Sequence, residues 1–259
     1  EKVPETLAQA DNNGRTPLYL AAEEGHLDVV RYLGEKVPET LAQAGGYYKS
    51  TPLSEAAENG HLDIVRYLGE QVPETLAKAD DAERTPLWWA ANGHLDVVQY
   101  LGEKVPETLA KANEYGTTPL WVAAENGHLD VVRYLGEKVP KTLAKADNDG
   151  ETPLWHAAAN GHFDVVRYLG EKAPETLAQA DDSWTPLWKA ADNGHLDIVR
   201  YLVKKVHETL DQVDNRKQTL LFHAAANGHL DVVRYLGEQA PETLAKANDG
   251  ETLLWRAAE

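Results

Sequence analysis

The sequence contains no cysteine and no methionine. The lack of cysteine excludes disulfides, thiol nucleophiles, iron–sulfur clusters and cysteine-ligated zinc, and it leaves the redox compartment open. No apolar run approaches the roughly 18–20 residues that span a bilayer, and no charged-then-apolar leader opens the chain. We therefore expect no membrane association, with cytoplasmic and secreted locations both open. Without an initiator methionine, the numbered chain is expected to be a processed or excised piece.

Positive charge is also scarce, because 25 Lys and Arg stand against 42 Asp and Glu, for a formal net charge of −17. Proteins that bind nucleic acid concentrate Lys and Arg on one face to pair with phosphates. The charge balance therefore argues against a nucleic-acid partner.

The chain is internally repetitive. Threonines that open the phrase T-[PL]-L recur every 33–35 residues, at Thr16, Thr51, Thr85, Thr118, Thr152, Thr185, Thr219 and Thr252. Near-copies of GHLDVVRYLGEKVPETLAQA run between them. A period of this length indicates a solenoid of stacked units and argues against two separate globular domains.

Each copy predicts two short helices and a turn. Thr16 is suited to cap a helix whose first residue is Pro17, and Gly25 provides a left-handed stop. The segment 26–37 has a helical apolar stripe and forms the second helix. Pro38 ends that helix and can open another short turn. The polar segment 11–15 reads as the turn between units.

These motifs resemble the ankyrin repeat family. The shared pattern is D-x-x-G-x-T-P-L-x-x-A-A-x-x-G-H-L-D-V-V-x-x-L, as in residues 147–169, and it recurs along essentially the whole chain. The tetratricopeptide repeat has a similar period but needs two helices of similar length, whereas the early glycine in each copy ends the first helix too soon.

The resemblance implies an all-α repeat solenoid of helix-turn-helix units, 33–35 residues each, joined by turns or short β-hairpins. We expect a single array over 1–259, with units near 11–44, 45–79, 80–112, 113–146, 147–180, 181–213 and 214–247 and partial units at 1–10 and 248–259. No polar terminal caps are recognisable. The chain is thus expected to be a segment of a longer array or to use its partial units as caps, and to be a monomer with end-to-end contacts open to it.

Two departures from the family pattern stand out. The family's stretch after the second helix is replaced by the longer EKVPETLAQA, so this loop should differ. The histidine of T-P-L-H is replaced by aromatic residues in most copies, which puts the hydrogen bond of that histidine in doubt. These aromatics are Tyr19, Trp88, Trp121, Trp155, Trp188, Phe222 and Trp255.

The next position along the first helix has no common chemistry. We call it the variable slot, and its occupants are Leu20, Glu55, Trp89, Val122, His156, Lys189, His223 and Arg256. A core position would not tolerate both Trp and Lys, so the slot is expected to face solvent together with the turn tips. The turns vary as freely, and the longer turn 45–50 should raise its two tyrosines above the neighbouring tips.

A constant scaffold that displays Trp, Tyr and Arg is typical of a protein-binding surface. Neutral drift would explain the variability but not the enrichment in Tyr and Trp. By resemblance, the turn tips and first helices form a concave binding face. The candidate partner-binding residues are Tyr47, Tyr48, Lys49, Glu55, Arg84, Trp89, Tyr115, Val122, His156, Trp184, Lys189, Arg216, His223 and Arg256. Their mixed charges favour a neutral or modestly basic protein.

Other functions receive less support. A regularly spaced row of Trp88, Trp121, Trp155 and Trp188 would suit carbohydrate binding if it were open to solvent. The GHLD motif offers His and Asp, but repeated copies of one local device indicate that the histidine bonds loop backbone and the aspartate favours its helix N-terminus. No serine lies in a nucleophile elbow, and no glycine loop resembles a phosphate site. We expect no catalysis, no cofactor and no metal site.

Overall fold

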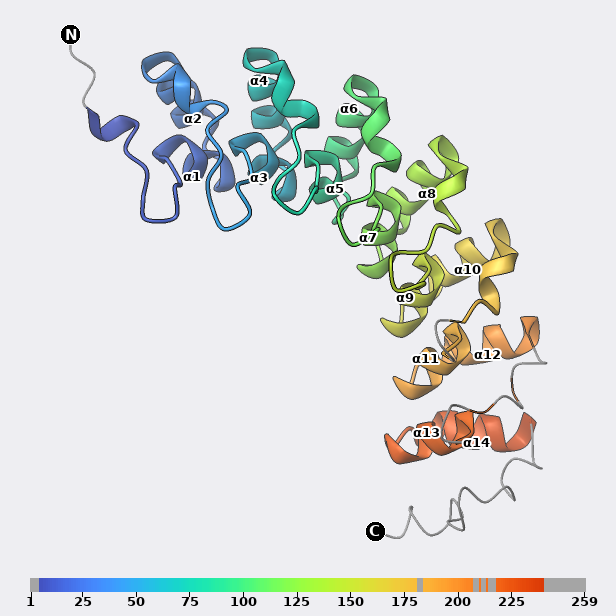
Figure 1. Ribbon diagram of the computed structural model, residues 1–259. Coiled ribbons are helices and arrows are strands. Elements are labelled where there is room, and N and C mark those ends of the chain that lie inside the picture. The colour runs from blue at the N-terminus through green and yellow to red at the C-terminus, as the bar shows by residue number, and fades with distance from the viewer. Residues whose placement is uncertain (1–4, 181–183, 207–209, 211–212, 214–217, 240–259) are drawn as a thin grey trace. The chain divides into compact units, whose positions relative to one another are not determined.

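The computed structural model describes residues 5–180, 184–206, 210, 213 and 218–239. The regular secondary structure of these residues is helical, and turns and loops connect the helices (Figure 1). The chain divides into two compact units. Unit 1 comprises Glu1–Ala123 and Asp130–Thr142, and unit 2 comprises Ala124–Leu129 and Leu143–Glu259.

Each repeat contributes a short first helix. These helices are α1 (Pro17–Glu23), α3 (Pro52–Glu58), α5 (Pro86–Ala90), α7 (Pro119–Glu125), α9 (Pro153–Ala159), α11 (Pro186–Asp192) and α13 (Leu220–Ala226). They begin where the sequence predicts, because a threonine side chain caps each one. The Tyr19 backbone N–H, for example, donates to Thr16 Oγ1 at 3.1 Å. The expected start signals are therefore confirmed.

A longer second helix follows in every repeat. These helices are α2 (Leu27–Lys36), α4 (Leu62–Gln71), α6 (Leu95–Lys104), α8 (Leu129–Lys138), α10 (Phe163–Lys172), α12 (Leu196–Lys205) and α14 (Leu230–Gln239). Short 3₁₀ helices lie at Glu5–Leu7, Pro38–Thr40, Pro73–Ala77, Pro106–Ala110, Pro140–Thr142 and Pro174–Leu177. In the second of them, buried Thr40 donates its hydroxyl to the Val37 carbonyl at 2.8 Å. The stretch that departs from the family pattern thus closes as a hydrogen-bonded turn.

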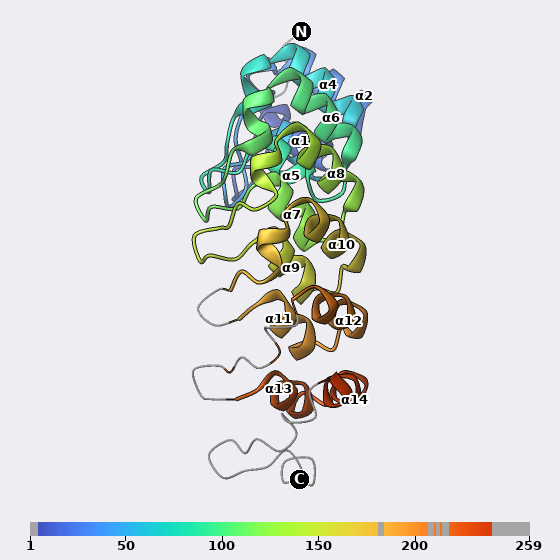
Figure 2. The same ribbon diagram turned by 90° about the vertical axis from the view of Figure 1, so that its right-hand side faces the viewer.

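The helices pack in two layers within each unit. In unit 1, α1, α3 and α5 lie side by side, and α2, α4 and α6 form the second layer; α9, α11 and α13 are arranged in the same way over α10, α12 and α14 in unit 2. The core between the layers contains Leu18 and Val30 in unit 1, for example, and Leu187 and Val199 in unit 2, all fully buried. Figure 2 shows the turns projecting from the side of the first helices, away from the second helices.

The turns are held by hydrogen bonds and not by β-strands. Asp80 Oδ1 accepts the backbone N–H groups of Ala82 and Arg84. Neighbouring turns are also tied together, since the Asp81 N–H donates to the Tyr48 carbonyl at 2.8 Å. The expected short hairpins are reduced, within the described residues, to two isolated antiparallel bridges, Gly45 with Ser50 and Val213 with Thr219.

Candidate functional site

Three of the exposed tyrosines of unit 1 lie at its turns, and a fourth, Tyr32, lies on α2. Tyr47, Tyr48 and Tyr115 are 88%, 42% and 59% exposed. The Tyr47 and Tyr48 rings meet edge to face, with centroids 4.8 Å apart. Lys49 beside them is exposed as well. The exposure expected for these four turn residues is confirmed.

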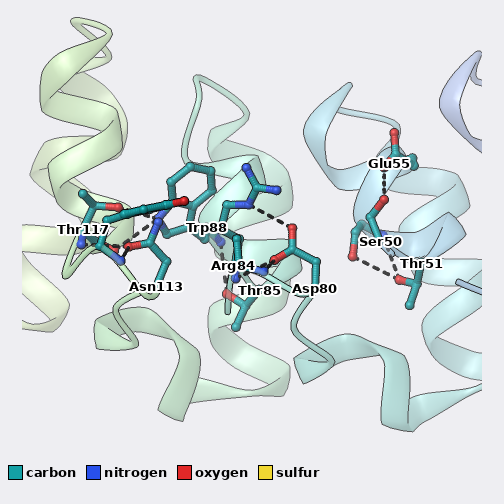
Figure 3. A network of polar contacts seen from close by, with 12 residues as sticks. Ser50, Thr51, Glu55, Asp80, Arg84, Thr85, Trp88, Asn113 and Thr117 are labelled. Atoms are coloured by element: carbon teal, nitrogen blue, oxygen red, sulfur yellow. Dashed lines mark hydrogen bonds and ion pairs between the residues drawn. The ribbon is translucent and has the colours of Figure 1, made fainter. Parts of the chain in front are cut away.

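Arg84 lies at the centre of this group. Its guanidinium carbon is 3.9 Å from the centroid of the Tyr48 ring and 4.1 Å from that of Trp89. Arg84 Nε donates to Asp80 Oδ2 at 2.9 Å, which fixes the side chain (Figure 3). Stacking of a guanidinium on aromatic rings adds attraction to their apolar contact. We call Tyr48, Arg84 and Trp89 the arginine cluster, and two neighbouring repeats build it.

Tyr115 belongs to the same region of unit 1. A hydrogen bond with the Glu114 carboxylate is the main cause of a raised pKa for the Tyr115 hydroxyl, and Tyr48 and Arg84 lie near enough to act on it electrostatically. The structure therefore brings the candidates of the second, third and fourth repeats together.

The predicted exposure of the variable slot is wrong in part. Glu55, Val122 and the neighbouring turn residue Arg84 are buried, while Trp89, His156, Lys189 and His223 are half-buried. Glu55, for instance, accepts a hydrogen bond from the Ser50 hydroxyl at 2.5 Å (Figure 3). Variable chemistry along this slot is therefore not a sign of exposure to water.

The candidates of unit 2 also contact one another. The Lys189 ammonium lies 4.8 Å from the centroid of the Trp184 ring and 5.0 Å from that of Trp155. The His223 ring meets Trp184 at 5.0 Å between centroids. Trp184, Lys189 and His223 thus form a second aromatic–cationic group. The predicted site residues Arg216 and Arg256 lie outside the described residues.

The aromatics that replace the family histidine are structural. Trp121, Trp155 and Trp188 are buried, at 7%, 6% and 0% exposed, and Trp88 is half-buried. Trp88 Nε1 donates to the Thr117 carbonyl at 3.1 Å, and Trp155 Nε1 donates to the Trp184 carbonyl at 2.8 Å. The carbohydrate interpretation required open indole faces, so burial removes its basis.

The histidines of the GHLD motif bond backbone, as predicted, but the acceptor is the last residue of a first helix and not a loop residue. His195 Nε2 lies 3.0 Å from the carbonyl oxygen of Ala159 in the preceding repeat, and His61 Nε2 lies 3.1 Å from that of Glu23. The repeated histidine therefore links neighbouring repeats through a hydrogen bond.

Three glutamates lie on the first-helix side of unit 1. Burial, and then the charge of Glu55, raise the pKa of Glu58 to about 7. Burial and the Glu55 charge also raise the pKa of Glu23. These side chains keep this region acidic beside the exposed tyrosines.

The raised pKa of Glu58 predicts that the stability of the folded chain depends on pH. Its folded-state pKa lies above the ordinary value of 4.5, so the folded chain retains a proton that the unfolded chain releases between about pH 4.5 and about pH 7. The free energy of unfolding should therefore fall as pH rises through this window. Glu58→Gln should be neutral near pH 4 and should stabilise the protein by about 1 kcal/mol near pH 8, a value reduced for partial solvation.

Urea unfolding at both pH values measures this effect. Glu39→Gln, at an exposed position on a 3₁₀ helix, is the matched control and should leave stability unchanged at both pH values. The prediction would be contradicted if Glu58→Gln had the same free energy of unfolding as the wild type at every pH.

The structure also bears on metal binding and on membrane insertion. Among the described residues, one group of three side chains has metal-ligand geometry, namely Asp147, Glu151 and His156 in unit 2. No helix in the described part of the chain has both the length and the apolar character needed to cross a membrane.

Comparison with known families accounts for the repeats. A model described as ankyrin repeats in three copies matches residues 40–109, 103–179 and 171–247, and a model of the single ankyrin repeat matches residues 13–37. A search of curated proteins finds no match. Ankyrin repeats are generally protein–protein interaction modules, and the proteins built from them are typically non-catalytic.

Two contacts of Arg84 differ in how far the sequence marks them. The ion pair between Asp80 and Arg84 lies within one turn, so both partners are close in the sequence. The contact of Arg84 with Tyr48 joins different repeats, and no local sequence signal marks it.

Proposed function

Because the chain belongs to the ankyrin repeat family, we propose that it binds a protein partner through the turn tips and first helices, with Tyr47, Tyr48 and Tyr115 of unit 1 as the main contacts. The observation that carries the proposal is the exposure of three large aromatic side chains around one arginine cluster. Exposed tyrosines are costly in an isolated protein, and Tyr, Trp and Arg supply most binding hot spots.

The arginine cluster supports the proposal by preorganisation. Asp80 holds Arg84 through an ion pair, and the guanidinium packs against the rings of Tyr48 and Trp89. Arg84 therefore holds the Tyr48 ring in place while part of the ring stays in water. A side chain already held in place loses little conformational entropy on binding. Trp89 is half-buried in the same cluster, so its contribution would come as much from support as from direct contact.

The chemistry of the partner follows from charge. The chain carries a formal charge of −17, and Glu23, Glu55 and Glu58 lie in the same unit as the tyrosines. Electrostatic complementarity favours a neutral to modestly basic protein surface. Trp184, Lys189 and His223 are a separate candidate contact group within unit 2.

Alanine substitutions test this proposal. Tyr48→Ala and Tyr115→Ala are each expected to weaken partner binding by at least about tenfold, because truncation of a hot spot costs about 2 kcal/mol or more. Both side chains are substantially exposed, so the melting temperature should barely change. Partners would be captured with the wild type and with the triple variant Tyr47→Ala/Tyr48→Ala/Tyr115→Ala, and affinities of captured proteins measured by calorimetry.

Tyr32 provides the matched control. It is 53% exposed but lies on α2, in the second-helix layer. Tyr32→Ala should therefore bind the partner as the wild type does. Equal losses for Tyr32→Ala and Tyr48→Ala, or no loss for either, would place the recognition surface elsewhere.

A further inference from the structure

One repeat of unit 2 brings three metal-ligating side chains together. Asp147, Glu151 and His156 each offer one ligand atom, and these atoms all lie within 4.8 Å of one another. We propose that they bind one divalent transition-metal ion of the zinc class. The proposal is independent of the protein-binding surface proposed above.

The fold positions each ligand from a different part of the same repeat. Asp147 opens the turn, and its Oδ1 accepts the backbone N–H groups of Asp149 and Glu151, at 3.1 and 2.9 Å. Glu151 directly precedes the capping residue Thr152, and His156 lies in the second turn of α9. The three side chains are thus fixed by a hydrogen-bonded turn and a capped helix, and none of the three residues is fully exposed.

Comparison with the equivalent positions of unit 1 shows what is unusual here. Asp11 pairs with Arg15 and Asp80 pairs with Arg84, in both cases at 2.9 Å, so a guanidinium balances the turn aspartate. At the same spacing, Asp147 is followed by Glu151. This repeat therefore carries a second carboxylate, Glu151, at the position where those two repeats carry an arginine.

Other charged groups lie close to the cluster. Glu125 is near enough to Asp147, Glu151 and His156 to interact with them electrostatically. Lys189 also acts on His156, and its ammonium lies over the rings of Trp155 and Trp184. A bound divalent cation would place a positive charge beside Asp147, as Arg15 and Arg84 do beside Asp11 and Asp80.

The ligand set suits zinc better than calcium or magnesium. Zinc accepts imidazole nitrogen and carboxylate oxygen at about 2.0–2.2 Å, so ligand atoms around it lie about 3.3 Å apart. His156 Nε2 and Glu151 Oε2 are now 2.6 Å apart and share a hydrogen bond, which metal binding would replace; the neutral imidazole would then carry its proton on Nδ1. Three protein ligands leave the fourth position to water. Calcium and magnesium prefer sites made wholly of oxygen.

Titration of the untagged, chelator-treated full chain tests the site. Calorimetry with Zn²⁺ should give one saturable site, and Co²⁺ should give the visible absorption of a tetrahedral complex. His156→Ala and Glu151→Arg should each lower the Zn²⁺ affinity by more than about tenfold, because even outer-shell contacts change metal affinity by that factor. Glu151→Arg rebuilds the Asp80–Arg84 pairing, so it should fold normally.

His223→Ala is the matched control. His223 occupies the same slot two repeats later, and its Nδ1 lies 3.4 Å from Asp192 Oδ1. This variant should bind Zn²⁺ as the wild type does. Wild-type affinity retained in folded His156→Ala and Glu151→Arg, or loss of binding only in His223→Ala, would overturn the proposal. So would a wild-type chain that binds no Zn²⁺ or prefers Ca²⁺.

Discussion

Trp155→Ala is expected to lower the free energy of unfolding by about 3–5 kcal/mol, the usual cost of removing a large buried aromatic side chain. Trp155 is 6% exposed, and its Nε1 donates to the Trp184 carbonyl of the next repeat at 2.8 Å. The substitution removes both the packing and the tie between repeats. Urea unfolding followed by circular dichroism measures the loss.

Two variants separate these contributions. Trp155→Phe keeps most of the packing but cannot donate, so it should cost the hydrogen-bond contribution of about 1 kcal/mol plus a smaller packing term. Tyr47→Ala removes a side chain that is 88% exposed and should change stability by less than about 0.5 kcal/mol. If Trp155→Ala unfolded at the same urea concentration as the wild type, the indole would not be what holds the repeats together.

Gly161→Ala is expected to destabilise unit 2 by about 3 kcal/mol. Gly161 has a φ of +81°, and an added Cβ would lie 2.6 Å from Cε1 of the His195 ring. The left-handed backbone costs about 1–2 kcal/mol for alanine. Displacement of the ring would also break the bond between His195 Nε2 and the Ala159 carbonyl, which adds about 1–2 kcal/mol.

Gly228 offers the matched comparison within the same unit. Its φ of +76° is similar, but an added Cβ would meet no atom within 4 Å. Gly228→Ala should therefore cost only the backbone part, about 1 kcal/mol. The difference between the two variants, measured by denaturant unfolding and by hydrogen exchange within the affected repeat, isolates the histidine contact. Equal losses of stability for Gly161→Ala and Gly228→Ala would mean that the His195 ring moves aside without cost.

The sequence predicts the helices well because their signals are local. Thr16 and Pro17 define a helix start within two residues, and Gly25 defines its end. The structural role of the GHLD histidine was also predictable, because the same motif recurs in repeat after repeat. Its acceptor was not, because His195 bonds Ala159 of the preceding repeat and no local sequence signal marks that contact.

Burial of the variable slot was not predictable in the same way, because it depends on tertiary contacts. Val122 is 5% exposed and Glu55 is 9% exposed, although their chemistry differs completely. Glu55 accepts a hydrogen bond from Ser50, which also bonds Tyr19 of the repeat before. Such a network can accommodate a buried carboxylate, and only the three-dimensional structure shows it.

The hydrogen bonds of the framework aromatics have a consequence for how this protein can evolve. Tyr19, Trp88 and Trp155 all reach the residue directly before the next capping threonine, namely Ser50, Thr117 and Trp184. The first of these connections spans a longer turn than the other two, yet it ends at the same point. Because the stacking register is fixed at the base of each turn, the tip can gain or lose residues without a shift of the helices. Insertions and deletions at a turn tip are therefore expected to leave the stacking of the helices intact.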